Sequence, residues 1–134
     1  MSGETDLVIL LQSLSARLAD GVYVFVTLED GVVPAGLRPR MMFREAEGTT
    51  LILLRTEAEE HGLAFEFPCR MITLEVHSSL AAVGFIARIA TALARHGMGV
   101  NPVSGFYHDH LFVPEGRAAE ALRILSEIAQ GKAG

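Results

Sequence analysis

The sequence has one cysteine, few basic residues and no long apolar run, and each of these absences excludes a class of function. Cys69 alone cannot form an intrachain disulfide or supply several thiolates to zinc, which suits a reducing cytosol. Eleven Lys and Arg against sixteen Asp and Glu give a net charge of −5, with no basic cluster for phosphates. A membrane span needs about 18 apolar residues in a row, and no such run occurs. We therefore expect a cytoplasmic protein that binds neither nucleic acid nor membrane.

The 134 residues are half hydrophobic and one fifth charged, which fits one compact domain or two small halves that share a core. Leucines recur at helical spacing from Leu7 to Leu18, so we expect a leading helix capped by Thr5 or Asp6. The segment Val22–Leu28, "VYVFVTL", is β-branched and aromatic on both faces, which predicts a buried strand.

The rest of the first half predicts a hairpin, a short helix and a strand. Two extended runs flank "AEG", which predicts a hairpin that turns at Glu47-Gly48. Thr56 and Glu59 have the spacing of a capping box, so a helix of about two turns should follow. The alternating segment Arg70–Val76, "RMITLEV", predicts the next strand.

The second half predicts a helix that begins near Leu80, two strands around a tight turn at His108-Asp109, and a final helix. Each half thus approximates the β-α-β-β-α-β pattern, so the predicted fold class is α+β, with two ferredoxin-like units, antiparallel sheets and helices on one face. We place the units at residues 1–67, with the extra leading helix, and 68–134. The last strand of the second unit is missing or short, and Val22–Leu28 or a partner subunit could supply it.

The stretch "ITLEVHSSLAAVGFIARIATALARHGMGVNPVSGFYHDHLFV" resembles an ACT domain. Gly84 falls on the glycine of the family signature Asp-x-Pro-Gly-x-Leu, and Ile86 falls on its leucine. Ala81 and Val83 stand where the signature has Asp and Pro, so its usual polar anchor is absent. The wider sequence looks like small bacterial tandem ACT proteins without an attached enzyme. The resemblance implies a regulatory module that binds an amino acid, has no catalytic activity and no cofactor, and signals through assembly or a partner. We also expect a homodimer, because units this small leave apolar area uncovered.

The start of the helix near Leu80 is the expected ligand site. Helix N-termini present unpaired N–H groups that suit a carboxylate, Ser78 or Ser79 can cap the helix and still offer a hydroxyl, and Gly84 permits close approach. We expect the first and third strands of the unit to be parallel, which brings Asn101 to the same end. The predicted ligand-binding residues are His77, Ser78, Ser79, Leu80, Gly84 and Asn101. In the alternative interpretation, the serines are only caps and Gly84 only relieves helix packing.

The triplet His108-Asp109-His110 raises the alternative of a small metal-dependent enzyme. We expect it at the far end of the hairpin, about 20 Å from His77, where Asp109 serves the turn and the histidines flank it. No recognised ligand spacing or nucleophile with an adjacent base accompanies the triplet, so no metal site is predicted. A third possibility is a ligand-free module for structure or protein interaction, because the Asp-x-Pro part of the signature is missing.

Overall fold

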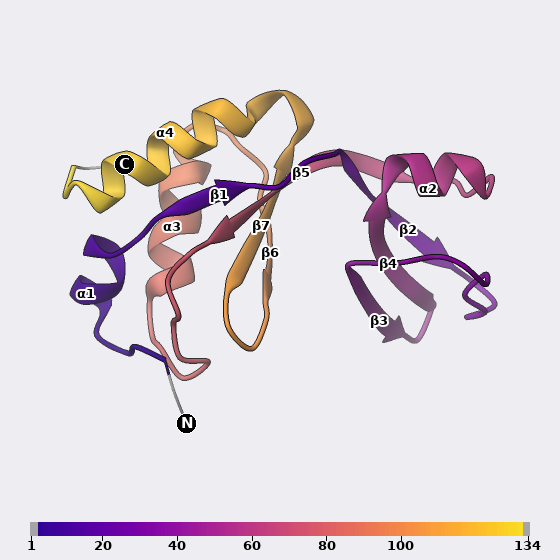
Figure 1. Cartoon of the computed structure of the whole chain (residues 1–134), viewed down its shortest axis with the longest axis horizontal. Helices are drawn as coiled ribbons and strands as arrows, with labels where there is room; N and C mark the ends of the chain where they lie inside the picture. Colours follow the sequence, from indigo (N-terminus) through magenta and orange to yellow (C-terminus); the bar gives the residue numbers. More distant parts are fainter. Residues whose placement is uncertain (1–2, 133–134) are drawn as a thin grey trace. The chain divides into compact units, whose positions relative to one another are not determined.

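The structure is a computed structural model that describes residues 3–132, and these form two compact units. Unit 1 contains residues 3–20 and 70–132, and unit 2 contains residues 21–69. Strand β5 (Glu66–Leu74) begins in unit 2 and ends in unit 1 (Figure 1). The predicted α+β class with antiparallel pairing and helices is confirmed.

Unit 2 is a small sheet with one helix. Its elements are β2 (Tyr23–Leu28), β3 (Met41–Glu45), β4 (Gly48–Leu54) and α2 (Arg55–Glu60), and its strand order is β3-β4-β2-β5. The predicted strand and hairpin are therefore confirmed. Glu45 pairs with Gly48, so the turn consists of residues 46–47 and comes one residue earlier than predicted. No helix follows β2, and Val33 and Leu37 of the long connection pack against the core instead.

The short helix α2 exists, but its predicted capping box is wrong. The helix begins directly after β4, where Arg55 donates its N–H to Val22 O at 2.8 Å, so Thr56 already lies inside the first turn. No side chain caps this end. The other end does close as expected, because Gly62 adopts φ +63° and donates to Glu59 O while Leu63 donates to Ala58 O.

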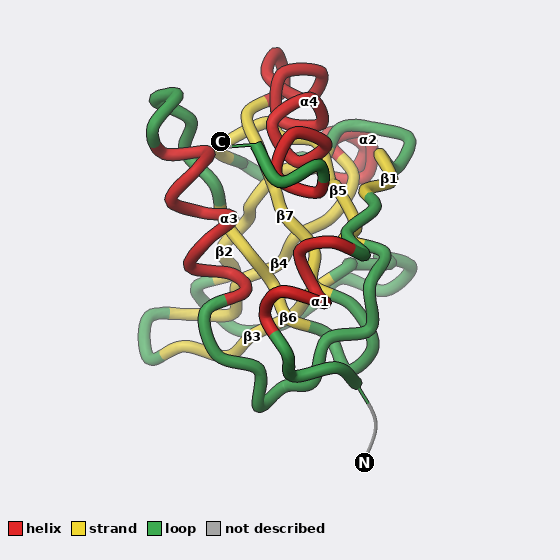
Figure 2. Tube along the Cα trace, turned by 90° about the vertical axis from the view of Figure 1, so that its left-hand side faces the viewer, coloured by secondary structure: helices red, strands yellow, loops and turns green. Residues whose placement is uncertain are grey.

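Unit 1 is a sheet with helices packed on it. Its strand order is β1-β5-β7-β6, and the helices lie on the viewer's side of these strands in Figure 2. The elements besides β5 are α1 (Leu7–Gln12), β1 (Ala16–Leu18), α3 (Phe85–Ala94), β6 (Asn101–Ser104), β7 (Asp109–Pro114), a 3-10 turn (Glu115–Arg117) and α4 (Ala118–Ala129). The core joins Leu10 of α1, Ile72 of β5, Ile89 of α3 and Leu125 of α4.

Strand β1 fills the gap that the sequence left in the second half. It pairs antiparallel with β5, with Ala16 opposite Leu74 and Leu18 opposite Ile72. The leading helix is therefore shorter than predicted, although Asp6 caps it by accepting from Ile9 N at 3.1 Å. Residues 3–20 pack with residues 70–132 in unit 1. The boundary predicted from the sequence, between residues 67 and 68, falls inside β5.

Helix α3 begins later than predicted. It begins at Phe85, and Leu80 and Val83 before it are 66% and 83% exposed. Its buried residues are Phe85, Ile89, Ala92 and Leu93. The predicted final helix is present as α4, and its buried residues are Ala118, Ala121, Ile124, Leu125 and Ile128.

Candidate ligand site

The candidate site is built on the segment that joins β5 to α3. Residues 3 and 4 hold this segment from one side, because Glu4 donates its N–H to His77 O at 2.8 Å and accepts from Ser79 N at 2.9 Å. Ser79 then makes a tight turn by accepting from Ala82 N through its carbonyl, at 2.9 Å, and from Ala81 N through its hydroxyl, at 3.1 Å. The turn delays the start of the helix and keeps Leu80 at the surface.

The start of β7 holds the segment from the other side. Ser78 Oγ donates to Asp109 Oδ2 at 2.9 Å, and the two residues are 8% and 6% exposed. Thr73 Oγ1 of β5 and His110 Nδ1 lie 3.0 Å apart. The start of β7 therefore lies beside the end of β5, and the expectation that these strands are parallel is wrong. The reason is topological: α3 returns the chain so that β6 runs in the direction of β5, and the hairpin then reverses β7.

The same contacts correct the predicted position of the histidine triplet. The hairpin loop comprises residues 105–108, closed by Gly105 N–H donating to His108 O at 2.9 Å, and Asp109 is the first residue of β7 rather than a turn residue. His108-Asp109-His110 thus lies at the candidate site and not a strand length away. Among residues 3–132, no three His, Cys, Asp or Glu side chains gather as metal ligands.

A cavity of about 180 Å³ opens between the joining segment, the start of α3 and the hairpin. Its lining residues are Ser78, Ser79, Leu80, Ala82, Gly84, Phe85, Ile86, Ala87, Ser104 and Asp109. Four of the six predicted site residues line it. The other two do not: the ring of His77 lies 5.4 Å from the ring of Tyr107, and Asn101 pairs with Phe112 in the sheet.

Sequence reasoning missed Asp109 and the first turn of α3. Asp109 was assigned to a turn, although an acidic residue directly before the apolar run "HLFV" is a signal for a buried carboxylate with a partner. The first turn of α3 was missed because the helix was expected to begin near Leu80.

The first turn of α3 has open hydrogen-bond donors. Gly84 precedes the helix at φ +91°, and no side chain caps it, so the prediction that Ser78 or Ser79 is the cap is wrong. The N–H groups of Phe85, Ile86 and Ala87 have no acceptor within the described part of the chain. These donors and the helix dipole favour a negative group, whereas the Asp109 carboxylate on the other wall favours a positive one. The cavity therefore offers both halves of a zwitterion a partner.

Two models of the ACT domain match this chain, one over residues 2–70 and the other over residues 66–127. The residues that both models share lie in β5, the strand common to the two units. Among proteins with curated functions, none matches the sequence significantly. No helix within residues 3–132 is long and apolar enough to cross a membrane.

Solved structures of similar fold cover nearly the whole chain. VC0802 from Vibrio cholerae, a protein of unknown function described as a possible transport protein, is 44% identical, with a TM-score of 0.82 over 92% of this chain and 96% of that one. Atu0741 from Agrobacterium tumefaciens is 16% identical, with a TM-score of 0.74 over 87% of this chain and 89% of its own. The regulatory subunit of aspartate kinase from Thermus thermophilus is 11% identical, with a TM-score of 0.63 over 87% and 96%. The two matches, which together cover residues 2–127, place this chain in the ACT domain family, as a protein with two ACT domains in tandem.

Proposed function

We propose that this protein is a regulatory module without catalytic activity that binds a small free amino acid in the cavity beside Asp109. Both family matches are to ACT domains, and the fold is that of the regulatory subunit of an aspartate kinase. These similarities support a regulatory role in general. The choice of an amino acid rests on the cavity itself.

The pairing of a buried carboxylate with an open helix start carries the proposal. An α-ammonium group placed against Asp109 would complete the hydrogen bonding that Ser78 begins, and an α-carboxylate would accept from the free N–H groups of Phe85 and Ile86. The volume of about 180 Å³ is below the roughly 300–1,000 Å³ of sites for drug-sized ligands, so it favours a small metabolite.

The predicted residues divide into two groups in this proposal. Ser78, Ser79, Leu80 and Gly84 line the cavity. His77 and Asn101 lie outside the lining, so a small ligand held in the cavity would not need to contact them. Asn101→Ala should therefore leave ligand binding unchanged, whereas Asp109→Asn removes the charge from the wall and should abolish binding.

A ligand in this cavity would signal by favouring one arrangement of the joining segment over another. Binding shifts an equilibrium only when the ligand contacts the two states differently. The joining segment is held by backbone hydrogen bonds to Glu4 and by the Ser78–Asp109 pair. A ligand that engages Asp109 gives the carboxylate a second partner beside Ser78, so it changes how firmly the segment is held, and assembly or a partner protein would respond to this change.

The proposal is tested by measuring thermal stability with each of the twenty amino acids at millimolar concentration. A ligand at one hundred times its Kd adds about 2.7 kcal/mol to the free energy of unfolding, a shift of several degrees for a chain of this size. We expect a small set of related amino acids to give this shift. Asp109→Asn should remove it, and Ser79→Trp should remove it by filling the cavity. Ala94→Trp, on an exposed part of α3 outside the lining, is the matched control. A flat screen, or a shift that survives in both variants, would refute the proposal.

A second candidate function is a protein-interaction module, which the surroundings of the cavity favour. Leu80, Val83, Phe106 and Tyr107 are all exposed large apolar side chains in the segments that form the cavity. Exposed apolar groups that gather in this way mark binding surfaces. In this alternative no amino acid shifts the melting temperature, and Phe106→Ser weakens capture of a partner from the cell extract.

A further inference from the structure

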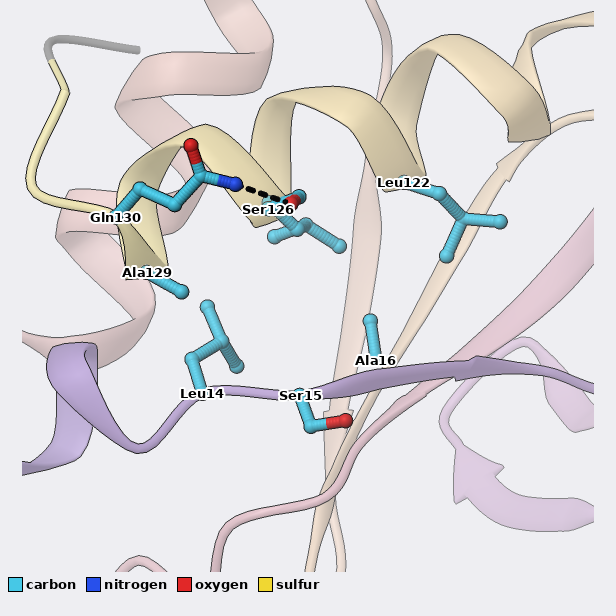
Figure 3. Close-up of a pocket in the computed structure, with 8 residues that line it drawn as sticks. Leu14, Ser15, Ala16, Leu122, Ser126, Ala129 and Gln130 are labelled. Carbon is cyan, nitrogen blue, oxygen red and sulfur yellow. Dashed lines mark hydrogen bonds between the residues drawn. The ribbon is translucent and has the colours of Figure 1, made fainter.

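Two cavities adjoin the C-terminal end of α4, and they differ in charge. The larger one, of about 510 Å³, lies between β1 and α4, and its lining residues are Leu14, Ser15, Ala16, Leu122, Leu125, Ser126, Ala129 and Gln130 (Figure 3). None of these residues is charged, and Gln130 Nε2 already donates to Ser126 Oγ at 3.1 Å. The larger cavity therefore has no charged group in its lining that would fix an ionic ligand.

The smaller cavity, of about 200 Å³, lies where α1, α3 and the end of α4 meet within unit 1 (Figure 1). Its lining residues are Val8, Leu11, Gln12, Arg88, Ile128, Gly131 and Lys132. Two of these residues are cations and none is an acid, although the whole chain has a net charge of −5. A concave site lined by charge of one sign attracts a ligand of the other sign. We call it the Arg88 cavity.

Arg88 brings to this cavity a guanidinium group that lacks an acceptor. Its Nη1 atom is buried and has no hydrogen-bond partner within the described part of the chain. Buried donors are nearly always satisfied, and one that donates to nothing costs free energy. A carboxylate suits this donor, because its two oxygens match the planar fork of the guanidinium group. The open donor therefore favours an anionic ligand.

The chain after α4 holds the second cation at the cavity. Gly131 adopts φ +81° and donates its N–H to Ile128 O at 3.0 Å, and Lys132 donates its N–H to Glu127 O at 2.9 Å. These two bonds form a Schellman motif, which fixes the main chain at Lys132. The Glu127 carboxylate pairs with Arg123 at 3.0 Å, so it does not neutralise Lys132.

The remaining walls select the hydrocarbon part of the ligand and disfavour an amino group. Val8, Leu11 and Ile128 are apolar, so a ligand gains by burying a short hydrocarbon chain against them. An ammonium group would find no carboxylate in this lining and would meet two positive charges. The volume restricts the ligand to a small metabolite.

We propose that the Arg88 cavity binds a small carboxylic acid that has a short hydrocarbon chain and no amino group. Arg88 would hold the carboxylate, and Lys132 would add to its attraction. This cavity shares no lining residue with the cavity beside Asp109 and has the opposite preference, since that cavity offers a carboxylate to an ammonium group. Together the two cavities would distinguish an amino acid from the acid that lacks its amino group.

Titration calorimetry of the whole chain with 4-methylpentanoate tests the proposal. Leucine is the matched probe, because it differs from this acid only by an amino group, and acetate is the probe without the hydrocarbon chain. At constant ionic strength we expect 4-methylpentanoate to bind with a Kd of about 1 mM or below. Acetate should bind at least about tenfold more weakly, and so should leucine in an Asp109→Asn background, which disables the other cavity.

Two variants assign the binding to this cavity. Arg88→Gln removes the guanidinium group and should raise the Kd for 4-methylpentanoate about tenfold or more. Arg17→Gln is the matched control, because Arg17 lies on β1, is exposed and does not line the cavity. Val8→Asp adds a negative charge to the lining and should weaken binding as much. It is expected to fold, because Val8 is 61% exposed in the first turn of α1, where an acidic residue suits the helix dipole.

The Asp109→Asn background also separates this test from that of the proposed function. Binding of 4-methylpentanoate should persist in this background, and its loss there would place the acid in the other cavity and overturn the proposal. The proposal is also overturned if 4-methylpentanoate does not bind the wild type, if leucine binds Asp109→Asn equally well, or if Arg88→Gln and Val8→Asp both bind the acid as the wild type does. A wild type that binds the acid but no amino acid would count against the proposed function alone.

Discussion

The Ser78–Asp109 hydrogen bond gives the sharpest test of the candidate site, because it is buried and easily removed. Its length is 2.9 Å, and neither residue is more than 8% exposed. A hydrogen bond to a charged group contributes about 1.5–3 kcal/mol, and Ser78→Ala leaves the Asp109 carboxylate without its donor. Asp109 also lines the cavity, where water can reach it, so we expect the lower part of that range.

The assay is urea unfolding of a double-mutant cycle. Ser78→Ala should lower the free energy of unfolding by about 1.5–2 kcal/mol in the wild-type background and by much less in the Asp109→Ala background. Ser104→Ala is the matched control, since Ser104 lines the same cavity but is exposed, and its hydroxyl makes no hydrogen bond within residues 3–132. This change should cost less than about 0.5 kcal/mol. If Ser78→Ala costs no more than Ser104→Ala, the pair does not hold the joining segment, and the account of the site is wrong.

Three further predictions follow from other buried or strained positions. Burial raises the pKa of the Cys69 thiol to about 12, so Cys69 should not react with a thiol reagent at pH 8 until the protein unfolds. The pKa of this thiol is raised from 9.0 in the unfolded chain, so the folded state holds the thiol proton more tightly. The resulting contribution to the free energy of unfolding is fully present below pH 9 and is lost as the pH rises from 9 to 12. Urea unfolding midpoints measured across that range would show the loss. Gly84→Ala should lower stability by about 1–2 kcal/mol, because φ is +91° there, and should weaken ligand binding by displacing the start of α3; calorimetry measures both effects. Leu10→Ala, at a fully buried position of α1, should cost about 2–5 kcal/mol in urea unfolding, whereas Val8→Ala, at an exposed position of the same helix, should cost little.

The sequence predicts those elements whose signal is local. The strand Val22–Leu28, the hairpin that follows it and helix α4 are each indicated by residues close together in the sequence, and all three are present. The ACT resemblance also comes from a continuous stretch, and the family matches confirm it. Ser78, Ser79 and Gly84 could be named as site residues because they fall between a predicted strand and a predicted helix.

Strand β1 could not be predicted because its pattern fits two structures. Leu10, Leu14 and Leu18 are spaced as on one face of a helix, while Leu14, Ala16 and Leu18 are also spaced as on one face of a strand. The partner that decides between them is β5, which lies more than fifty residues later in the chain. The intrinsic preferences of neighbouring residues carry no information about such a distant contact.

The role of Asp109 depended on topology in the same way. If β5 and β7 are assumed to be parallel, His108-Asp109-His110 is placed at the wrong end of the sheet and Asp109 is assigned to a turn. Because β5 and β7 are antiparallel, Asp109 lies beside Ser78 and accepts a hydrogen bond from it. The Ser78 hydroxyl therefore does not cap α3, and the cavity has a carboxylate on its wall.

Unit 1 is built from two separate stretches of chain, with unit 2 inserted between them, and this fixes the order in which the protein can fold during synthesis. Residues 3–20 are made before unit 2, but their partners in β5, α3 and α4 are made during or after it. At about 5–20 residues per second, the leucines of α1 and β1 wait roughly 5–20 s before their core can close. Unit 2, whose residues are contiguous, can form in that interval and hold the two stretches of unit 1 close together. We expect the nascent N-terminal leucines to need a chaperone more than any other part of this chain.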